Sequence, residues 1–186
     1  MSHRFTDIAF TESVKAVQSA YGSRVHNDRL QEQAGPNDQL GPSEAGFIAA
    51  RDTFYLATVG ESGWPYVQHR GGPPGFLQII NPGQLAYADF RGNTQLISTG
   101  NVTINDRCSL ILMDYTRRKR LKILGHMHVQ NAADTSSELL AAVHSNDYRA
   151  EIERVVIINV AAFDWNCPQH ITKRYTEAEI AARNQV

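Results

Sequence analysis

Three consecutive polar side chains and a loop rich in glycine and proline make up one stretch of the sequence, Gln68-His69-Arg70-Gly71-Gly72-Pro73-Pro74-Gly75. The guanidinium of Arg70 is a planar fork that can hold a phosphate through two hydrogen bonds. Gln68 and His69 add polar groups on opposite faces of a strand, and Gly71 lets a ligand approach the backbone. The stretch predicts an anion site, although an exposed strand end before a wide loop explains the spacing equally well.

A second polar stretch lies where a predicted strand runs into a predicted helix, Asp89-Phe90-Arg91-Gly92-Asn93-Thr94-Gln95. A helix N-terminus offers free N–H groups and partial positive charge, which both favour a phosphate. Arg91, Asn93 and Gln95 add side-chain donors. Taken alone, this stretch is better explained as a polar capping turn. Because both stretches end strands only a short hairpin apart, a shared site is the stronger interpretation of the two together.

The third stretch gathers an indole, two amides, a thiol and an imidazole, Phe163-Asp164-Trp165-Asn166-Cys167-Pro168-Gln169-His170-Ile171. Trp165 can stack on a flat ring, while Asn166 and Gln169 can bond to its polar edge. We expect Cys167 to be buried and inert, because the sequence near it shows neither a helix N-terminus nor a basic partner. The mixture of side chains is typical of a segment that contacts a ligand.

Other candidate sites have weaker support. His126 and His128 share one face of a predicted strand, but the spacing supplies no third ligand, so no metal site is predicted. The basic run 117–120 is better explained as a solvated turn than as a nucleic-acid patch. The sequence has no P-loop, no Gly-x-Gly-x-x-Gly and no Gly-x-Ser-x-Gly, which argues against Rossmann dinucleotide sites and acyl-transfer enzymes.

The composition fits a soluble globular protein with one main core. The chain has 186 residues, a formal net charge of -1 and 42% hydrophobic residues, so no overall charge attracts nucleic acid or a membrane surface. No apolar run is long enough to span a membrane, and the polar start lacks a signal peptide's apolar region. With only Cys108 and Cys167, a disulfide framework is not expected, and a cytoplasmic location follows.

Hydrophobic patterning predicts a mainly β domain with peripheral helices. Residues 1–42 form an arm with one helix, which Thr11 caps and Gly22 ends, followed by a polar loop from residue 23. Ser43 is expected to cap a second short helix, and Thr135 and Thr176 open later ones. Strands are predicted over 54–59, 64–70, 76–80, 84–90, 107–115, 120–130 and 155–160, with a short helix over 93–101. Consecutive strands joined by tight turns favour an antiparallel barrel over a doubly wound parallel sheet.

The three polar stretches together resemble the pyridoxamine 5'-phosphate oxidase-like family, and more narrowly its flavin-binding branch of bacterial proteins. The resemblance covers about residues 43–175, before a short C-terminal helix over 176–186, and the N-terminal arm is also similar in that branch. It implies a split β-barrel, a homodimer, and one FMN in each of two clefts between subunits. The oxidase itself has an Arg…Lys strand and a Ser-Arg-Lys turn, where this chain has Gln68-His69-Arg70 and Phe90-Arg91-Gly92. The resemblance therefore supports the cofactor more firmly than the oxidase reaction.

The resemblance also implies a set of cofactor residues, namely Gln68, His69, Arg70, Gly71, Asp89, Phe90, Arg91, Asn93, Gln95, Lys122, Trp165, Asn166 and Gln169. The strand that ends at Gly71 and the turn over 91–95 would hold the phosphate and the ribityl chain. Lys122 would reach the flavin edge, and the segment 165–170 would come from the other subunit and cover the ring. His170 is the first candidate for a general acid and His69 the second.

We therefore expect an FMN-dependent oxidoreductase that acts on an unknown small substrate or electron donor. The cofactor would carry the redox chemistry, and the protein would position and tune it. The alternative is a flavin or haem binder without catalytic activity, in which His126 or His128 could be an axial haem ligand. A deazaflavin in place of FMN is a third possibility.

Overall fold

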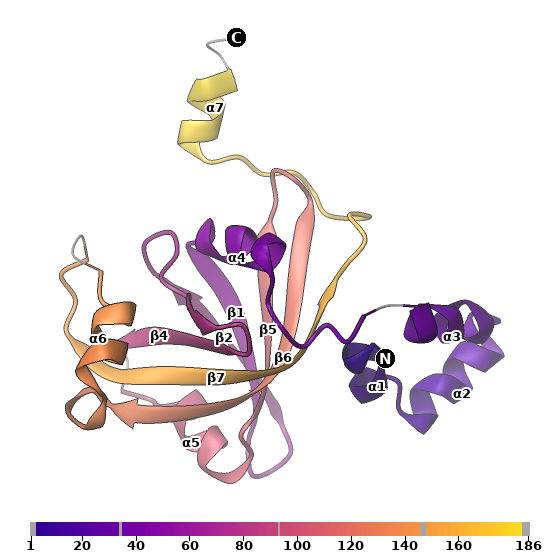
Figure 1. Cartoon of the computed structure of the whole chain (residues 1–186), viewed down its shortest axis with the longest axis horizontal. Helices are drawn as coiled ribbons and strands as arrows, with labels where there is room; N and C mark the ends of the chain where they lie inside the picture. Colours follow the sequence, from indigo (N-terminus) through magenta and orange to yellow (C-terminus); the bar gives the residue numbers. More distant parts are fainter. Residues whose placement is uncertain (1–2, 34, 93, 146–147, 184–186) are drawn as a thin grey trace.

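A computed structural model describes residues 3–33, 35–92, 94–145 and 148–183. Its centre is one antiparallel sheet of seven strands in the order β2-β1-β5-β6-β7-β4-β3 (Figure 1). The strands are β1 Thr53–Val59, β2 Pro65–Gly71, β3 Gln78–Asn81, β4 Gln84–Phe90, β5 Arg107–Asp114, β6 Lys119–Asn131 and β7 Ile152–Trp165. The predicted hairpins and antiparallel sheet are confirmed.

The sheet is rolled, so that its two ends approach each other. β2 lies at one end of the strand order, and β4 lies beside the opposite end. Arg70 of β2 nevertheless donates a hydrogen bond to Asp89 of β4, at 2.9 Å. This seam between β2 and β4 is joined by side chains rather than by a backbone ladder, which makes the fold a split β-barrel.

The main core fills the inside of the barrel, as the alternation in β6 predicts. Leu121, Ile123 and Met127 are fully buried, whereas Lys122 and His126 on the other face are half-buried and exposed, respectively. Gly125 lies at a register shift between β6 and β7, and a Cβ atom there would be only 2.7 Å from the backbone oxygen of Asn159. A second, smaller core of Ala86, Ala88, Val143, Val155 and Ile157 lies between α6 and the sheet.

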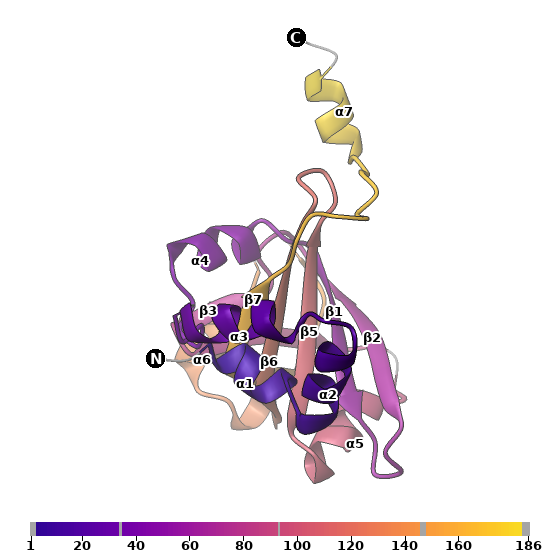
Figure 2. The same ribbon diagram turned by 90° about the vertical axis from the view of Figure 1, so that its right-hand side faces the viewer.

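The helices surround the barrel without forming a second layer (Figures 1 and 2). They are α1 Arg4–Ala9, α2 Glu12–Ala20, α3 Arg24–Gln33, α4 Pro42–Ala49, α5 Ile97–Ile104, α6 Ser137–Val143 and α7 Glu177–Arg183, with a 3-10 turn at Ala132–Asp134. Within the described ranges, no helix has the length and apolarity needed to cross a membrane. The predicted Thr11 cap, the end of this helix before Gly22, and the capping box of Thr176 with Glu179 are confirmed, and Gly22 has a positive φ of 71°.

Several predicted boundaries are wrong. Residues 24–33 form α3 instead of a loop, because side-chain pairs such as Arg24 with Asp28 support a helix that is polar on most of its surface. Gly41, not Ser43, precedes α4, where the Glu44 carboxylate accepts the Gly41 N–H at 2.9 Å. Ser136, not Thr135, caps α6.

Two further differences affect the candidate site. The helix predicted over 93–101 begins only at Ile97, after Leu96 in a left-handed conformation, so the turn over 91–95 is not its N-terminus. The strand predicted over 155–160 extends from Ile152 to Trp165. Its long pairing with β6 carries Trp165 into the sheet, where the sequence predicted irregular structure.

Candidate functional site

A carboxylate between two guanidinium groups forms the centre of the candidate site. One oxygen of Asp89 accepts from Arg70 Nη1 at 2.9 Å, and the other accepts from Arg154 Nε at 2.9 Å. Asp89 is only 9% exposed, and each arginine side chain is 17% exposed. The strands explain this convergence, because Arg70 pairs with the buried Phe54 and therefore points into the barrel, while Asp89 and Arg154 are register partners on β4 and β7.

The two arginines keep donors that Asp89 does not use. Arg70 Nε is buried and, within the described part of the chain, has no hydrogen-bond partner. The same guanidinium lies 5.9 Å from the ring centre of Tyr87, whose hydroxyl is also buried without a described partner, and burial raises the pKa of that hydroxyl. Arg154 pairs through Nε with Asp89 and through Nη2 with Glu153, both at 2.9 Å, so among the described residues its Nη1 takes part in neither of these ion pairs. Such N–H groups are suited to a phosphate.

A pocket of about 70 Å³ opens beside this ion cluster. Its lining includes Gln68 from β2, Asp89 from β4, Gln95 from the turn before α5, and Arg154 from β7. The Gln68 Oε1 accepts from the Ser98 hydroxyl of α5 at 3.1 Å, so the Gln68 amide N–H groups remain donors. The fold thus brings parts of the first two polar stretches together.

The remaining residues of the first stretch line a neighbouring pocket of about 190 Å³. His69 and Gly71 belong to it, and Arg70, Asp89 and Phe90 line both pockets. A Cβ atom at Gly71 would lie 3.1 Å from His69 Cε1. Together the two pockets give a small ligand access to both sides of the Arg70–Asp89 pair.

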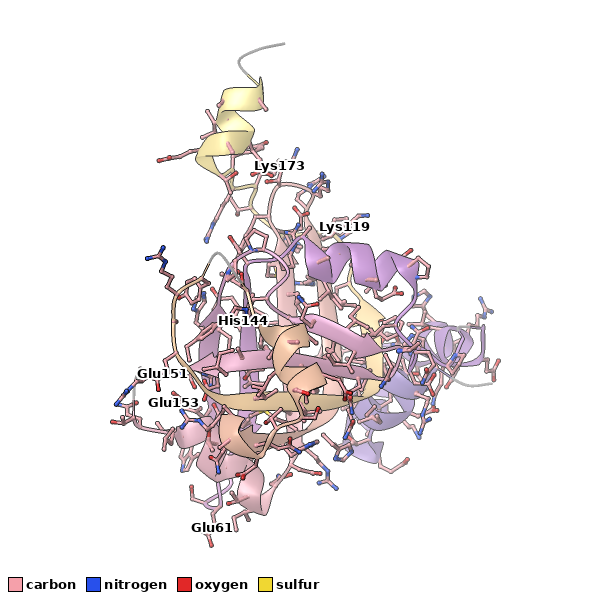
Figure 3. All side chains as sticks on the ribbon, turned by 60° about the vertical axis from the view of Figure 1, so that its left-hand side comes forward. Glu61, Lys119, His144, Glu151, Glu153 and Lys173 are labelled. Atoms are coloured by element: carbon pink, nitrogen blue, oxygen red, sulfur yellow. The ribbon has the colours of Figure 1, made fainter. Side chains whose placement is uncertain are left out.

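Arg91 of the second stretch does not join this site. Arg91 is 69% exposed in its side chain and donates to Glu151 at 2.9 Å, with Glu153 at 3.7 Å. The hydrogen bond to Glu151 raises the pKa of Arg91. Figure 3 shows Glu151 and Glu153 close together at the start of β7. Asn93 lies outside the described residues.

Lys122 lies on the outer face of β6, away from the two pockets. Its Nζ is 3.5 Å from the Asp164 carboxylate and 4.7 Å from the ring centre of Phe5 in α1. The N-terminal arm therefore covers part of the surface from which Lys122 would have to reach a flavin.

The third stretch lies at a separate pocket of about 690 Å³, which Trp165 and Asn166 line. Trp165 Nε1 donates to Glu44 at 2.7 Å, because Trp165 shares the inward face of β7 with Phe163. Cys167 is exposed, so the prediction of a buried thiol is wrong: the chain has left the sheet there.

The remaining members of the third stretch are accessible at the surface. Gln169 and His170 are both exposed, and His170 has a positive φ of 61°. One chain therefore brings the first two stretches together but not the third. His126 and His128 are exposed as well, with His126 Nδ1 3.0 Å from Asp106, and the described residues include no cluster of three or more metal-ligating side chains.

Sequence reasoning missed Arg154 and Ser98 as residues of the site. Arg154 directly precedes the apolar run that begins at Val155. A cation at the start of a buried strand needs a carboxylate partner, and this was the available signal. Ser98 gave no signal of its own, because its role depends on where α5 lies against β2.

Comparisons with known proteins identify the family. The family model described as pyridoxamine 5'-phosphate oxidase matches residues 42–166. HupZ from Group A Streptococcus is 16% identical, with a TM-score of 0.54, and the match covers 73% of this chain and 100% of HupZ. A Clostridium acetobutylicum protein related to general stress protein 26, of the pyridoxinephosphate oxidase family, is 11% identical, with a TM-score of 0.51 and coverage of 74% and 94%.

At these identities the two structures support the fold alone, and that fold agrees with the antiparallel split barrel. No protein of curated function matches the sequence. The family match, in contrast, includes all seven strands in full, from β1 to the end of β7. Since it spans well over half of the sequence, the chain belongs to the pyridoxamine 5'-phosphate oxidase family.

Proposed function

We propose that this protein binds FMN and acts as a flavin-dependent oxidoreductase on a small substrate. The observation that carries the proposal is the convergence of Gln68, Arg70 and Arg154 around Asp89 in a pocket of phosphate size. Membership of the family supports the choice of a flavin. When bound, FMN supplies hydride or electron transfer at its ring, and the protein supplies binding, orientation and electrostatics.

The phosphate end of FMN is assigned to the pocket beside Asp89. Arg70 and Arg154 each use one donor on Asp89, and a guanidinium has five, so both can also bond a phosphate. The Gln68 amide is oriented by Ser98 and adds a neutral donor. Asp89 holds the two cations close together and lowers the repulsion between them, so they form a preorganised anion site.

The ring end is assigned to a cleft that a second copy of the chain completes. His69 lines the pocket next to Arg70 and is the candidate proton donor that one chain itself supplies there. Lys122, Asn166, Gln169 and His170 would come from the second copy, because none of them lines the two pockets at Asp89. Val67 and Tyr55 form an exposed apolar surface on neighbouring strands, 61% and 40% exposed, which supports a homodimer.

The first test is the identity of the bound chromophore. Purified protein is denatured, and the released molecule is identified by its absorption spectrum and by mass spectrometry. FMN is the expected result, and anaerobic addition of reduced nicotinamide then tests whether it can be reduced. A Soret band, a deazaflavin mass, or a colourless protein that takes up no added FMN would contradict the proposal.

A further inference from the structure

The N-terminal arm is attached to the barrel at its root, whereas α2 and α3 stand out beyond α1 (Figures 1 and 2). At the root, α1 packs on β7 and buries Phe5 and Thr6. The Phe163 N–H of β7 donates to the backbone oxygen of Asn37 at 2.7 Å, so the chain that returns after α3 is fixed to the same strand. The arm is therefore held firmly at both of its ends.

The hairpin formed by α2 and α3 has no core of its own. No residue from 12 to 32 is buried. The two helices have nine and ten residues, and isolated helices shorter than about 12–15 residues are only marginally stable in water. Such helices gain most of their stability when an apolar face is covered. The α2–α3 hairpin thus needs a covering surface from outside itself.

The same hairpin presents apolar side chains for such a surface. Val17 and Tyr21 lie one turn apart on α2 and are 58% and 85% exposed, and Val25 and Leu30 of α3 are exposed as well. Together with Val14, Val17 and Tyr21 line an open groove of about 360 Å³. A group of exposed apolar side chains of this kind marks an interaction surface.

The charges of the α2–α3 hairpin indicate what kind of partner covers it. Acidic and basic side chains balance, and several pair within their own helix, as Glu12 does with Lys15 and Arg24 with Asp28. Nucleic acids are bound through an excess of Lys and Arg, and helices that lie on membranes carry a basic polar face. Because the hairpin has neither, its partner is the apolar surface of a protein.

The outer face of the sheet leads directly to the arm. Tyr55 of β1 pairs with Ile111 of β5, which pairs with Lys122 of β6, so these three side chains form a row across the outer face. The row ends at the arm, because Lys122 Nζ lies 4.7 Å from the ring centre of Phe5 in α1. Tyr55 also belongs to the apolar surface that the proposed function assigns to a homodimer. A second copy that packs on this surface therefore meets the arm.

We propose that the α2–α3 hairpin packs on a second copy of this chain and forms part of the dimer interface. Two-fold symmetry uses each surface twice, so the exposed faces of both hairpins are covered in one closed dimer. This proposal rests on the homodimer of the proposed function but does not require its flavin.

Sedimentation velocity of the flavin-free full chain, over a range of concentrations, tests the contribution of the hairpin. Val17→Ser with Tyr21→Ser is expected to raise the dimer Kd at least about tenfold, because apolar contacts are lost from both copies. Serine has about the same helix propensity as valine, so α2 is retained. The matched control, Ile104→Ser with Ile180→Ser, removes two exposed apolar side chains from α5 and α7, away from the arm (Figure 1), and is expected to leave the Kd unchanged.

Photo-crosslinking identifies the partner directly. Tyr21 is replaced by p-benzoylphenylalanine, and copies with light and heavy isotopes are mixed before irradiation. We expect a covalent dimer whose cross-linked peptides join one light copy to one heavy copy. The same photoreactive residue in place of Ile180 is the control and is expected to give no covalent dimer.

Three results would overturn the docking of the hairpin on a second copy. These are a Kd that the Val17 and Tyr21 variant leaves unchanged, an equal rise of the Kd in both double variants, and cross-links from position 21 that stay within one copy. A chain that sediments as a monomer at every concentration would refute both this proposal and the homodimer of the proposed function. A dimer that binds no flavin would refute the proposed function alone.

Discussion

Arg154 shares the Asp89 carboxylate with Arg70, and its replacement tests the proposed phosphate site most directly. In Arg154→Ala, one guanidinium is lost, and Asp89 keeps only one cation. A hydrogen bond to a charged group contributes about 1.5–3 kcal/mol, and each 1.4 kcal/mol is a factor of ten in affinity. We therefore expect the Kd for FMN to rise by about 10- to 100-fold.

Riboflavin isolates the phosphate contribution, because it has the same ring and ribityl chain without the phosphate. Binding of both flavins to the apoprotein is measured by quenching of flavin fluorescence. Arg154→Ala should weaken FMN binding and leave riboflavin binding within about twofold, since charge-assisted contacts act only on the phosphate. Arg107→Ala, at an exposed position on β5, is the matched control and should change neither affinity.

Asp89→Asn should change the ratio of FMN affinity to riboflavin affinity in the opposite direction. It removes the negative charge between the two guanidiniums and should raise the preference for FMN over riboflavin, while it destabilises the folded protein. Equal losses of FMN and riboflavin binding in Arg154→Ala would refute a phosphate role for this residue. Thermal unfolding of each variant separates a loss of binding from a loss of folding.

Three further predictions concern the scaffold. Gly125→Ala should lower the free energy of unfolding in urea by about 1–3 kcal/mol, because the new methyl group would meet the Asn159 backbone at 2.7 Å. An unaltered midpoint of urea unfolding in Gly125→Ala would show that β6 and β7 can move apart at residue 125. At pH 8 only Cys167 should react with a thiol reagent, since burial raises the pKa of Cys108 to about 12; two fast-reacting thiols would disprove this. The pKa of Asp114 is lowered in the folded protein, because hydrogen bonds from Arg117 and the charge of Arg51 outweigh the effect of burial. Asp114 therefore stabilises the fold fully at pH values above its ordinary pKa of 3.8, and this stabilisation is lost as the pH falls through the folded-state pKa. Asp114→Asn should therefore flatten the acid limb of stability in chemical denaturation, and an unchanged limb would count against the assignment.

The strands could be predicted from the sequence because the barrel imposes a two-residue period on them. In β6, the alternation of Leu121 and Ile123 with Lys122 is visible in the sequence and appears unchanged as burial. The tight turn over 60–63 and the capping box at Thr176 depend on local chemistry, which a short window contains. Helix α3 could not be predicted this way, because its support comes from polar side-chain pairs rather than an apolar stripe.

The candidate site was only partly predictable, because its contacts join distant positions. Arg70 and Asp89 are 19 residues apart, and Arg154 is 65 residues from Asp89. Residue types indicated an anion site near Arg70, but nothing local says which cations share one carboxylate. Trp165 was misplaced for a related reason: its position depends on how far β7 continues to pair with β6, and its neighbour Glu44 is 121 residues away.

The seam between β2 and β4 ties cofactor binding to the motion of an edge strand. Among the described strands β2 pairs with β1 alone, and the Arg70–Asp89 bond joins it to the other end of the sheet. A ligand that binds the Arg70 guanidinium must change the free energy of opening of β2. By thermodynamic reciprocity, opening of β2 changes the affinity of the site for the ligand. The rate of amide hydrogen exchange along Pro65–Gly71 should then report whether the site is occupied, even for ligands that have no colour.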